Sequence, residues 1–159
     1  MWFLLAAFVF AALTALAVWK PNRKLEFVAK PAVMAVLFLY LWTSVGLQGA
    51  PLWFGLGMLF SLAGDVLLLW LERFFLRGLI AFLLAHVAYL IGFNMPALPI
   101  SLWGLLLAVI IGLGGARLIR RILSALAEKR AARLRIPVAV YGAVISLMFL
   151  SAMLKLTDT

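Results

Sequence analysis

The chain has 159 residues, of which 68% are hydrophobic and 12% are charged, whereas a soluble domain usually has about a quarter of its residues charged. This composition excludes an ordinary water-soluble fold and favours a chain that is surrounded by lipid. The formal net charge of +9 does not indicate nucleic-acid binding, because the basic residues lie in short segments between long apolar runs.

Six apolar runs are each long enough to form a transmembrane helix, which needs about 20 mostly apolar residues. In chain order they cover approximately residues 2–19, 26–47, 51–71, 74–93, 100–118 and 136–154. The first run does not resemble a cleaved signal peptide, because no basic segment precedes it and Lys20 follows it directly. The sequence therefore predicts an all-α fold, a polytopic transmembrane bundle of about six helices that forms one integral membrane domain over residues 1–159.

The lysines and arginines predict the orientation of these helices. Thirteen of the fourteen lie in or next to the first, third and fifth connections, and Lys155 is the exception. The positive-inside rule places these connections in the cytoplasm and the N-terminus outside, in a membrane that we expect to be a bacterial inner membrane. The amphipathic segment from Arg117 to Arg135 is predicted to continue the fifth helix into the headgroup region. There it sets the topology, which we favour, or attracts anionic lipid.

Asp65 is the main candidate for a functional residue. It lies about six residues before the cytoplasmic end of the third helix, which is roughly 9 Å along the helix axis. An ionised side chain in the bilayer costs about 2.5–3.5 kcal/mol, so it needs a partner or a function. Gly57, Ser61 and Asp65 are spaced four residues apart and share one face, whose small residues allow another helix to approach. Asp65 is thus predicted to be the centre of a functional site or an anchor between two helices.

Five other polar residues accompany this acid. Lys30 has the same predicted depth and either pairs with it or extends to the headgroups. His86 and Tyr89 share a face of the fourth helix, and His86 is either a site residue or a satisfied core residue. Arg77 and Tyr141 lie near the cytoplasmic boundary, where they contact a phosphate headgroup or anchor the helix ends. Because the chain has no cysteine and one histidine, we expect no metal site and no cofactor.

Ordered segments of the chain resemble the YhhN-like lysoplasmalogenases, a family of integral membrane hydrolases. The resemblance covers approximately residues 27–152, and the third and fourth helices are its most specific part. The segments and residues that carry it are Lys30-Pro31, which resembles the opening of the family's second helix, residues 60–68 with Gly64-Asp65, Phe75, Gly78, Leu79, Phe82, His86 and Tyr89, and Tyr141-Gly142 with Met148 and Ala152.

The resemblance implies cleavage of the vinyl ether bond of lysoplasmalogens, which are membrane lysophospholipids, to a fatty aldehyde and a glycerophospho-headgroup. It implies two sets of site residues, a catalytic set of Asp65, Lys30 and His86 and a substrate-binding set of Ser61, Arg77, Tyr89 and Tyr141. Family members usually have about eight helices, and the seventh carries a second acidic motif, Ser-Asp, that this sequence lacks. The sequence is therefore expected to be either a fragment or a shortened member with an incomplete catalytic pair.

The implied chemistry agrees with the residues found. A vinyl ether is hydrolysed by proton transfer to carbon, which gives an oxocarbenium ion that water captures, so the reaction needs a general acid and a stabilising carboxylate. The sequence leaves open which of these roles Asp65 takes. Two other functions are also open, a small transporter or channel with Asp65 as its proton or ion site, and an inactive truncated relative. No inverted repeat supports the transporter.

Overall fold

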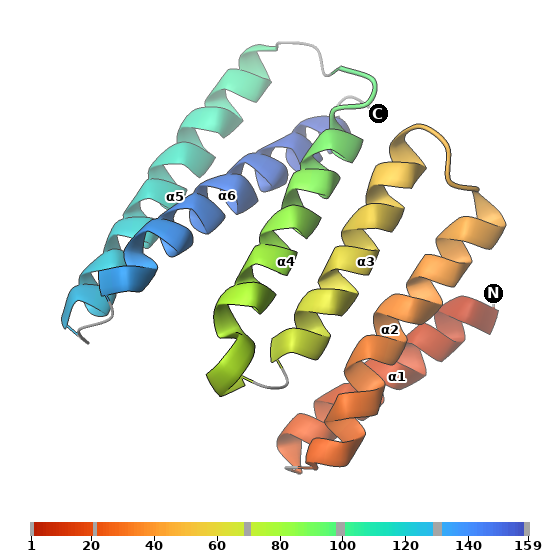
Figure 1. Ribbon diagram of the computed structural model, residues 1–159. Coiled ribbons are helices and arrows are strands. Elements are labelled where there is room, and N and C mark those ends of the chain that lie inside the picture. The colour runs from red at the N-terminus through yellow and green to blue at the C-terminus, as the bar shows by residue number, and fades with distance from the viewer. Residues whose placement is uncertain (1, 21, 69–70, 98–100, 129–131, 158–159) are drawn as a thin grey trace. The chain divides into compact units, whose positions relative to one another are not determined.

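The computed structural model describes residues 2–20, 22–68, 71–97, 101–128 and 132–157 (Figure 1). The elements in these ranges are α1 (Trp2–Trp19), α2 (Arg23–Ser44), α3 (Ala50–Leu68), α4 (Leu71–Phe93), α5 (Leu102–Glu128), the short 3-10 helix η1 (Ala132–Leu134) and α6 (Arg135–Thr157). Six of these helices are long and apolar enough to cross a membrane. The predicted all-α fold with six spans is confirmed, and the protein is a multi-pass membrane protein. The orientation with the N-terminus outside stays a prediction.

The start of α2 differs from the sequence prediction because a capping residue sets it. The helix begins at Arg23, before the predicted start at Glu26. The side chain of Asn22 accepts a hydrogen bond from the backbone N–H of Leu25 at 3.2 Å, which satisfies one of the otherwise unpaired donors of the first turn. Lys30 lies inside α2, as the predicted helix over residues 26–47 also placed it.

The end of α2 and the α3–α4 connection also differ from the prediction. The helix ends at Ser44 and not at residue 47, because Gly46 has a φ of +80°, in the left-handed region that terminates helices. The described part of α3 ends at Leu68, and Leu71, predicted as the end of the third helix, is the first residue of α4. The predicted start of the fourth helix at Phe74 is therefore too late.

The last two helices extend beyond their predicted ends. The expected start of the fifth helix at Ile100 lies outside the described residues, and α5 begins at Leu102 after Ser101, whose hydroxyl accepts a hydrogen bond from the backbone N–H of Gly104 at 3.0 Å. The helix continues past the predicted end at residue 118 and stops at Glu128, so the expected extension is confirmed as far as Glu128 and not to Arg135, which begins α6. α6 similarly continues past residue 154.

The structure divides into two compact units, Met1–Ala88 and Tyr89–Thr159, which are described separately. In the first unit α1 packs on α2 and α2 packs on α3. α3 and α4 contact each other through Gly64 and Gly78. In the second unit α5 and α6 run antiparallel and pack along each other (Figure 1). The single domain predicted from the sequence stays a prediction.

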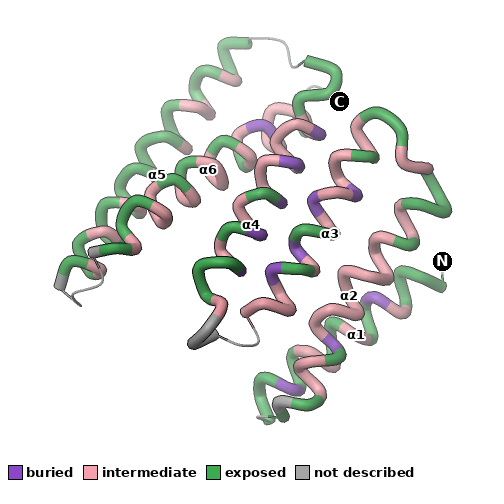
Figure 2. The backbone as a smooth tube through the Cα atoms, viewed as in Figure 1, coloured by how far each residue is buried: buried purple, intermediate pink, exposed green. Residues whose placement is uncertain are grey.

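Small residues form the interior of these units. The buried apolar residues in the described part of the chain are alanines, at positions Ala7, Ala17, Ala29, Ala81, Ala85 and Ala88. Figure 2 colours the backbone by burial, and buried residues occupy only short stretches of the helices. Large apolar side chains lie outside, and Trp2, Trp103 and Ile136 are 85%, 73% and 77% exposed. Lipid tails solvate such side chains, and small residues let helices approach closely enough to pack. The distribution is the one that a helix bundle needs in a bilayer.

Candidate functional site

The first feature of the candidate site is the close approach of α3 and α4. A Cβ atom placed on Gly64 would lie 2.7 Å from two atoms of the Phe82 ring, and one placed on Gly78 would lie 2.8 Å from Cδ2 of Leu68. Ordinary contacts between carbon atoms are about 3.5–4.0 Å, so a larger residue at either position would force the ring of Phe82 or the side chain of Leu68 to move. Ser61, on the same side of α3, is 4% exposed. The predicted small-residue face of the third helix therefore does contact another helix.

Asp65 lies on α3 between two packing faces. Gly64 faces α4, whereas Gly55 faces α2, where a Cβ atom would lie 3.3 Å from Cε2 of Phe38. Since successive helix residues are rotated by about 100°, Asp65 lies about 100° from Gly64 and about 80° from Gly55, within the arc between them. Its side chain is half-buried. The carboxyl group therefore leaves α3 between the two helices that pack against it.

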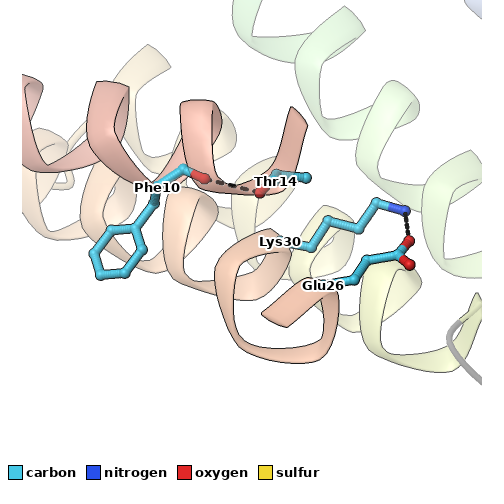
Figure 3. A network of polar contacts seen from close by, with 4 residues as sticks. All are labelled: Phe10, Thr14, Glu26 and Lys30. Atoms are coloured by element: carbon cyan, nitrogen blue, oxygen red, sulfur yellow. Dashed lines mark hydrogen bonds and ion pairs between the residues drawn. The ribbon is translucent and has the colours of Figure 1, made fainter. Parts of the chain in front are cut away.

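Lys30 of α2 is the cation that acts on this carboxyl group. The Lys30 ammonium interacts electrostatically with Asp65. Its Nζ atom also lies 3.0 Å from Oε1 of Glu26, one turn earlier on α2 (Figure 3). Neither alternative from the sequence describes Lys30 fully, because it is ion-paired with Glu26 and also acts on Asp65. We call Glu26, Lys30 and Asp65 the charged cluster.

Glu26 is the member of the charged cluster that sequence reasoning missed. It was interpreted only as the start of the second helix. The signal was available, since a Glu four residues before a Lys is the favourable order for an ion pair along a helix. The side chains of Lys30 and Glu26 are 40% and 28% exposed, so both members of the ion pair are partly buried. Glu26 adds a second carboxylate to a site for which the sequence predicted one.

His86 makes a hydrogen bond to the backbone of its own helix, α4. Its Nδ1 atom lies 2.6 Å from the carbonyl oxygen of Phe82, one turn earlier on α4. A carbonyl oxygen only accepts hydrogen bonds, so Nδ1 carries the proton, and a neutral ring then has an acceptor at Nε2. Phe82 in turn places its ring against Gly64. This hydrogen bond agrees with one of the two alternatives from the sequence, that His86 is a core residue whose hydrogen bonds are satisfied. A catalytic role for His86 stays a prediction.

Three candidates remain, Arg77, Tyr89 and Tyr141. Arg77 is exposed on α4, and its guanidinium carbon lies 5.1 Å from the centre of the Phe74 ring, a cation–π arrangement. Tyr89 and Tyr141 belong to the second unit, and both are half-buried. Binding of a substrate by Ser61 or by any of these three residues stays a prediction. Among the described residues, no group of three or more His, Cys, Asp or Glu side chains is placed to hold a metal ion.

Taken together, the six apolar helices define a polytopic membrane protein, and its first helices carry a cluster of ionisable side chains. The model of the YhhN family matches residues 25–159, so the chain belongs to the YhhN family. The match includes the whole charged cluster and excludes α1. No curated protein and no solved structure matches the chain.

Proposed function

We propose that the protein is a membrane-embedded hydrolase of the lysoplasmalogenase type, which cleaves the vinyl ether bond of lysoplasmalogens. The resemblance to that family's Gly-Asp helix and the membership of the YhhN family support the substrate class. The observation that carries the proposal is the charged cluster, in which the half-buried Asp65 interacts electrostatically with a lysine that is ion-paired with Glu26. An ionisable group in a membrane interior needs a function or a partner, and the carboxyl group of Asp65 can serve the chemistry as general acid.

The reaction begins with proton transfer from the general acid to the vinyl carbon that is farther from the ether oxygen. The π electrons form the new C–H bond, and a lone pair of the ether oxygen forms the C=O bond of an oxocarbenium ion. Water adds to the carbon next to oxygen and loses a proton to a carboxylate, which gives a hemiacetal. The hemiacetal breaks into a fatty aldehyde and the glycerol hydroxyl of the headgroup, so one water is consumed and the acid is regenerated.

We assign the general acid to Asp65 and a balancing role to Glu26. After Asp65 gives up its proton, its carboxylate is next to the oxocarbenium ion and stabilises it by charge. An unpaired Lys30 ammonium would oppose this by repelling the same cation. Because Glu26 lies 3.0 Å from Lys30, the pair adds little net charge to the site.

Arg77 is the residue that we assign to the phosphate headgroup. Arg77 directly precedes Gly78 in the chain. Gly78 contacts Leu68 near the C-terminal end of α3, and Asp65 lies near the same end. The guanidinium of Arg77 is exposed and is a good geometric match for a phosphate. The apolar tail of the substrate would then extend along the helices away from the charged end.

The test is hydrolysis of a 1-alkenyl lysophospholipid by the purified chain in detergent, measured as aldehyde release. Asp65→Asn is expected to lower turnover at least 100-fold, as general acid catalysis contributes about 10²–10⁴-fold. Ser124→Ala is the control variant, because that exposed hydroxyl only donates to the carbonyl oxygen of Arg120 at 3.0 Å. Reaction in D₂O should place one deuterium on the carbon next to the aldehyde group.

A lysophospholipid with a saturated ether chain is the control substrate, because it has no double bond to accept the proton. Aldehyde release that persists in Asp65→Asn would remove this carboxyl group from the mechanism. Ion flux through proteoliposomes in the absence of any lipid turnover would favour the transporter instead.

A further inference from the structure

The second unit contains an open pocket between the C-terminal end of α4 and α6. The pocket has a volume of about 440 Å³, in the lower part of the range of roughly 300–1,000 Å³ that is usual for ligand sites. Two of its lining residues are polar, Asn94, which directly follows α4, and Ser151 of α6. The others are apolar, namely Leu90, Ile91, Met95, Leu147 and Leu150. None of them belongs to the charged cluster, so the pocket is separate from the candidate site.

The two polar residues are joined by a hydrogen bond. The amide nitrogen of Asn94 donates to Oγ of Ser151 at 2.9 Å and to the carbonyl oxygen of Leu90 at 2.8 Å. Because a carbonyl oxygen only accepts, the second bond fixes which end of the Asn94 amide is the NH₂ group. Both N–H donors are then used, and Oδ1 of Asn94 is left to accept. Asn94 is exposed, so a bound molecule can reach this oxygen.

Ser151 supplies a matching donor. It is 7% exposed, and its hydroxyl oxygen accepts the bond from Asn94. Its hydroxyl proton has no acceptor among the residues that the structure describes. In contrast, the hydroxyl of Ser146 on the same helix donates to the carbonyl oxygen of Gly142 at 2.8 Å. A buried hydroxyl donor without an acceptor is unfavourable, and Ser151 therefore offers this donor in the pocket that it lines.

The pocket is apolar toward the membrane interior and polar toward its outer end. Leu90 and Leu147 lie four residues before Asn94 and Ser151, which is about 6 Å earlier along the helix axes. The charge pattern predicts that α4 and α6 both run from the cytoplasm outward, so the polar pair lies nearer the outer surface. An acyl chain that lies between the helices therefore has its polar head beside Asn94 and Ser151.

The charges around the pocket favour an uncharged head group. No residue that lines the pocket is charged, and the sequence from Asn94 to Ser101 contains no charged residue. Oδ1 of Asn94 is an acceptor, so it would repel a phosphate or a carboxylate. Lys155 lies four residues beyond Ser151, about 6 Å along α6, and does not line the pocket. A hydroxyl group both donates and accepts, so it can pair with Asn94 and Ser151 together.

We propose that this pocket binds one uncharged single-chain lipid whose head carries a hydroxyl group, as in a monoacylglycerol. The acyl chain lies against Leu90, Leu147 and Leu150. A hydroxyl of the head donates to Oδ1 of Asn94 and accepts from the hydroxyl of Ser151. The site is independent of the hydrolase proposed above, since it shares no residue with the charged cluster and binding involves no reaction.

The test is native mass spectrometry of the purified full chain titrated with monooleoylglycerol and, in parallel, with the same lipid methylated on both hydroxyls. Monooleoylglycerol is expected to bind about 3–10-fold more tightly, the effect of one hydrogen bond, and Asn94→Ala should abolish this preference. Ser151→Ala should weaken binding of monooleoylglycerol about 3–10-fold as well. Ser146→Ala is the matched control, because its hydroxyl donates to Gly142 and does not line the pocket, and it should leave binding unchanged.

Further variants test the apolar part of the pocket and the charge of the ligand. Leu147→Trp adds bulk to a lining residue and is expected to weaken binding about fivefold or more. Phe149→Trp is its matched control, because Phe149 is also exposed on α6 and does not line the pocket. Oleate, which has the same chain and an anionic head, should bind more weakly than monooleoylglycerol. Lys155→Gln should leave the affinity for monooleoylglycerol unchanged.

Four results would overturn the proposal. Equal affinity for monooleoylglycerol and its methylated form would mean that no hydroxyl is recognised. Equal affinities of the Ser151 and Ser146 variants would remove the donor from the site. Tighter binding of oleate that is lost in Lys155→Gln would mean that the pocket takes an anionic lipid. Equal binding by the Leu147 and Phe149 variants would mean that the pocket holds no acyl chain. Thermal unfolding of each variant in detergent confirms that the compared proteins are folded.

Discussion

Replacement of Gly64 by alanine tests the packing of α3 on α4 that supports Asp65. The added Cβ atom would lie 2.7, 2.7 and 3.0 Å from three atoms of the Phe82 ring. Ordinary carbon contacts are about 3.5–4.0 Å, so the ring or the helix has to move by roughly 1 Å. Phe82 also accepts the His86 hydrogen bond through its backbone carbonyl, and this bond lies within α4, so a shift of the whole helix leaves it intact.

Two effects of opposite sign determine how much Gly64→Ala changes the free energy of unfolding. Overpacking of this kind costs about 1–3 kcal/mol. Alanine is about 1 kcal/mol better than glycine in a helix interior, which offsets part of the loss. Gly112→Ala has the second effect without the first, because its Cβ meets nothing within 4 Å on α5. The difference between the two variants therefore isolates overpacking, and Gly64→Ala should be about 1–3 kcal/mol less stable than Gly112→Ala.

Reversible unfolding in mixed micelles of a mild detergent and dodecyl sulfate, followed by far-ultraviolet circular dichroism, measures this difference. Phe82→Leu provides a second test, because it removes the ring that the new methyl group meets. Its own cost should be smaller in the Gly64→Ala background than in the unaltered chain, with a coupling free energy of about 0.5–3 kcal/mol. Equal stabilities of the Gly64 and Gly112 variants, together with additive effects of Phe82→Leu, would refute the close approach of α3 and α4.

Three further predictions concern polar contacts. Glu26→Gln and Lys30→Met should show a coupling free energy of about 0.3–1 kcal/mol in a double-mutant cycle, because the pair at 3.0 Å is partly exposed. This coupling should fall as NaCl is raised from 0.05 to about 1 M, and a coupling of zero at both concentrations would contradict the ion pair. Ser151→Ala should cost about 0.5–1.5 kcal/mol, since the Asn94 amide donates to the hydroxyl of the buried Ser151 at 2.9 Å. In the Ser151→Ala background, Asn94→Ala should lower the free energy of unfolding by less than it does in the unaltered chain. Equal losses in the two backgrounds would argue against the hydrogen bond between Asn94 and Ser151. Asn22→Ala should cost about 1 kcal/mol and speed hydrogen exchange in the first turn of α2, and unchanged exchange there would exclude the cap.

Local sequence determined the number and type of the helices. Whether a segment spans a bilayer depends on its own length and apolarity, and all six predicted segments form helices of the required length. The ends were predicted less well, because hydropathy changes gradually whereas a helix ends at particular groups. The side chain of Asn22 starts α2 earlier, and the positive φ of Gly46 ends it earlier, than the apolar pattern indicated.

The site was predicted in part. Asp65 was identified because an ionised group inside a membrane has a high free-energy cost, which is a property of that residue and its depth alone. The pairing of Lys30 with Glu26 lies within one helix and was in principle predictable from their spacing. The interaction of Lys30 with Asp65 was one of two alternatives that the sequence left open, since the choice between them depends on how α2 packs against α3.

The consecutive glycines of α5 show most directly what tertiary structure adds. Gly114 and Gly115 are chemically identical neighbours in the sequence, and hydropathy assigns them the same environment. A rotation of about 100° between them turns Gly115 toward Ser146 of α6 and leaves Gly114 facing an open groove. The sequence alone determined that these residues lie in a helix within the membrane. Only the packing of one helix on another decided which of them makes contact, because contact depends on direction around the helix axis as well as on position along it.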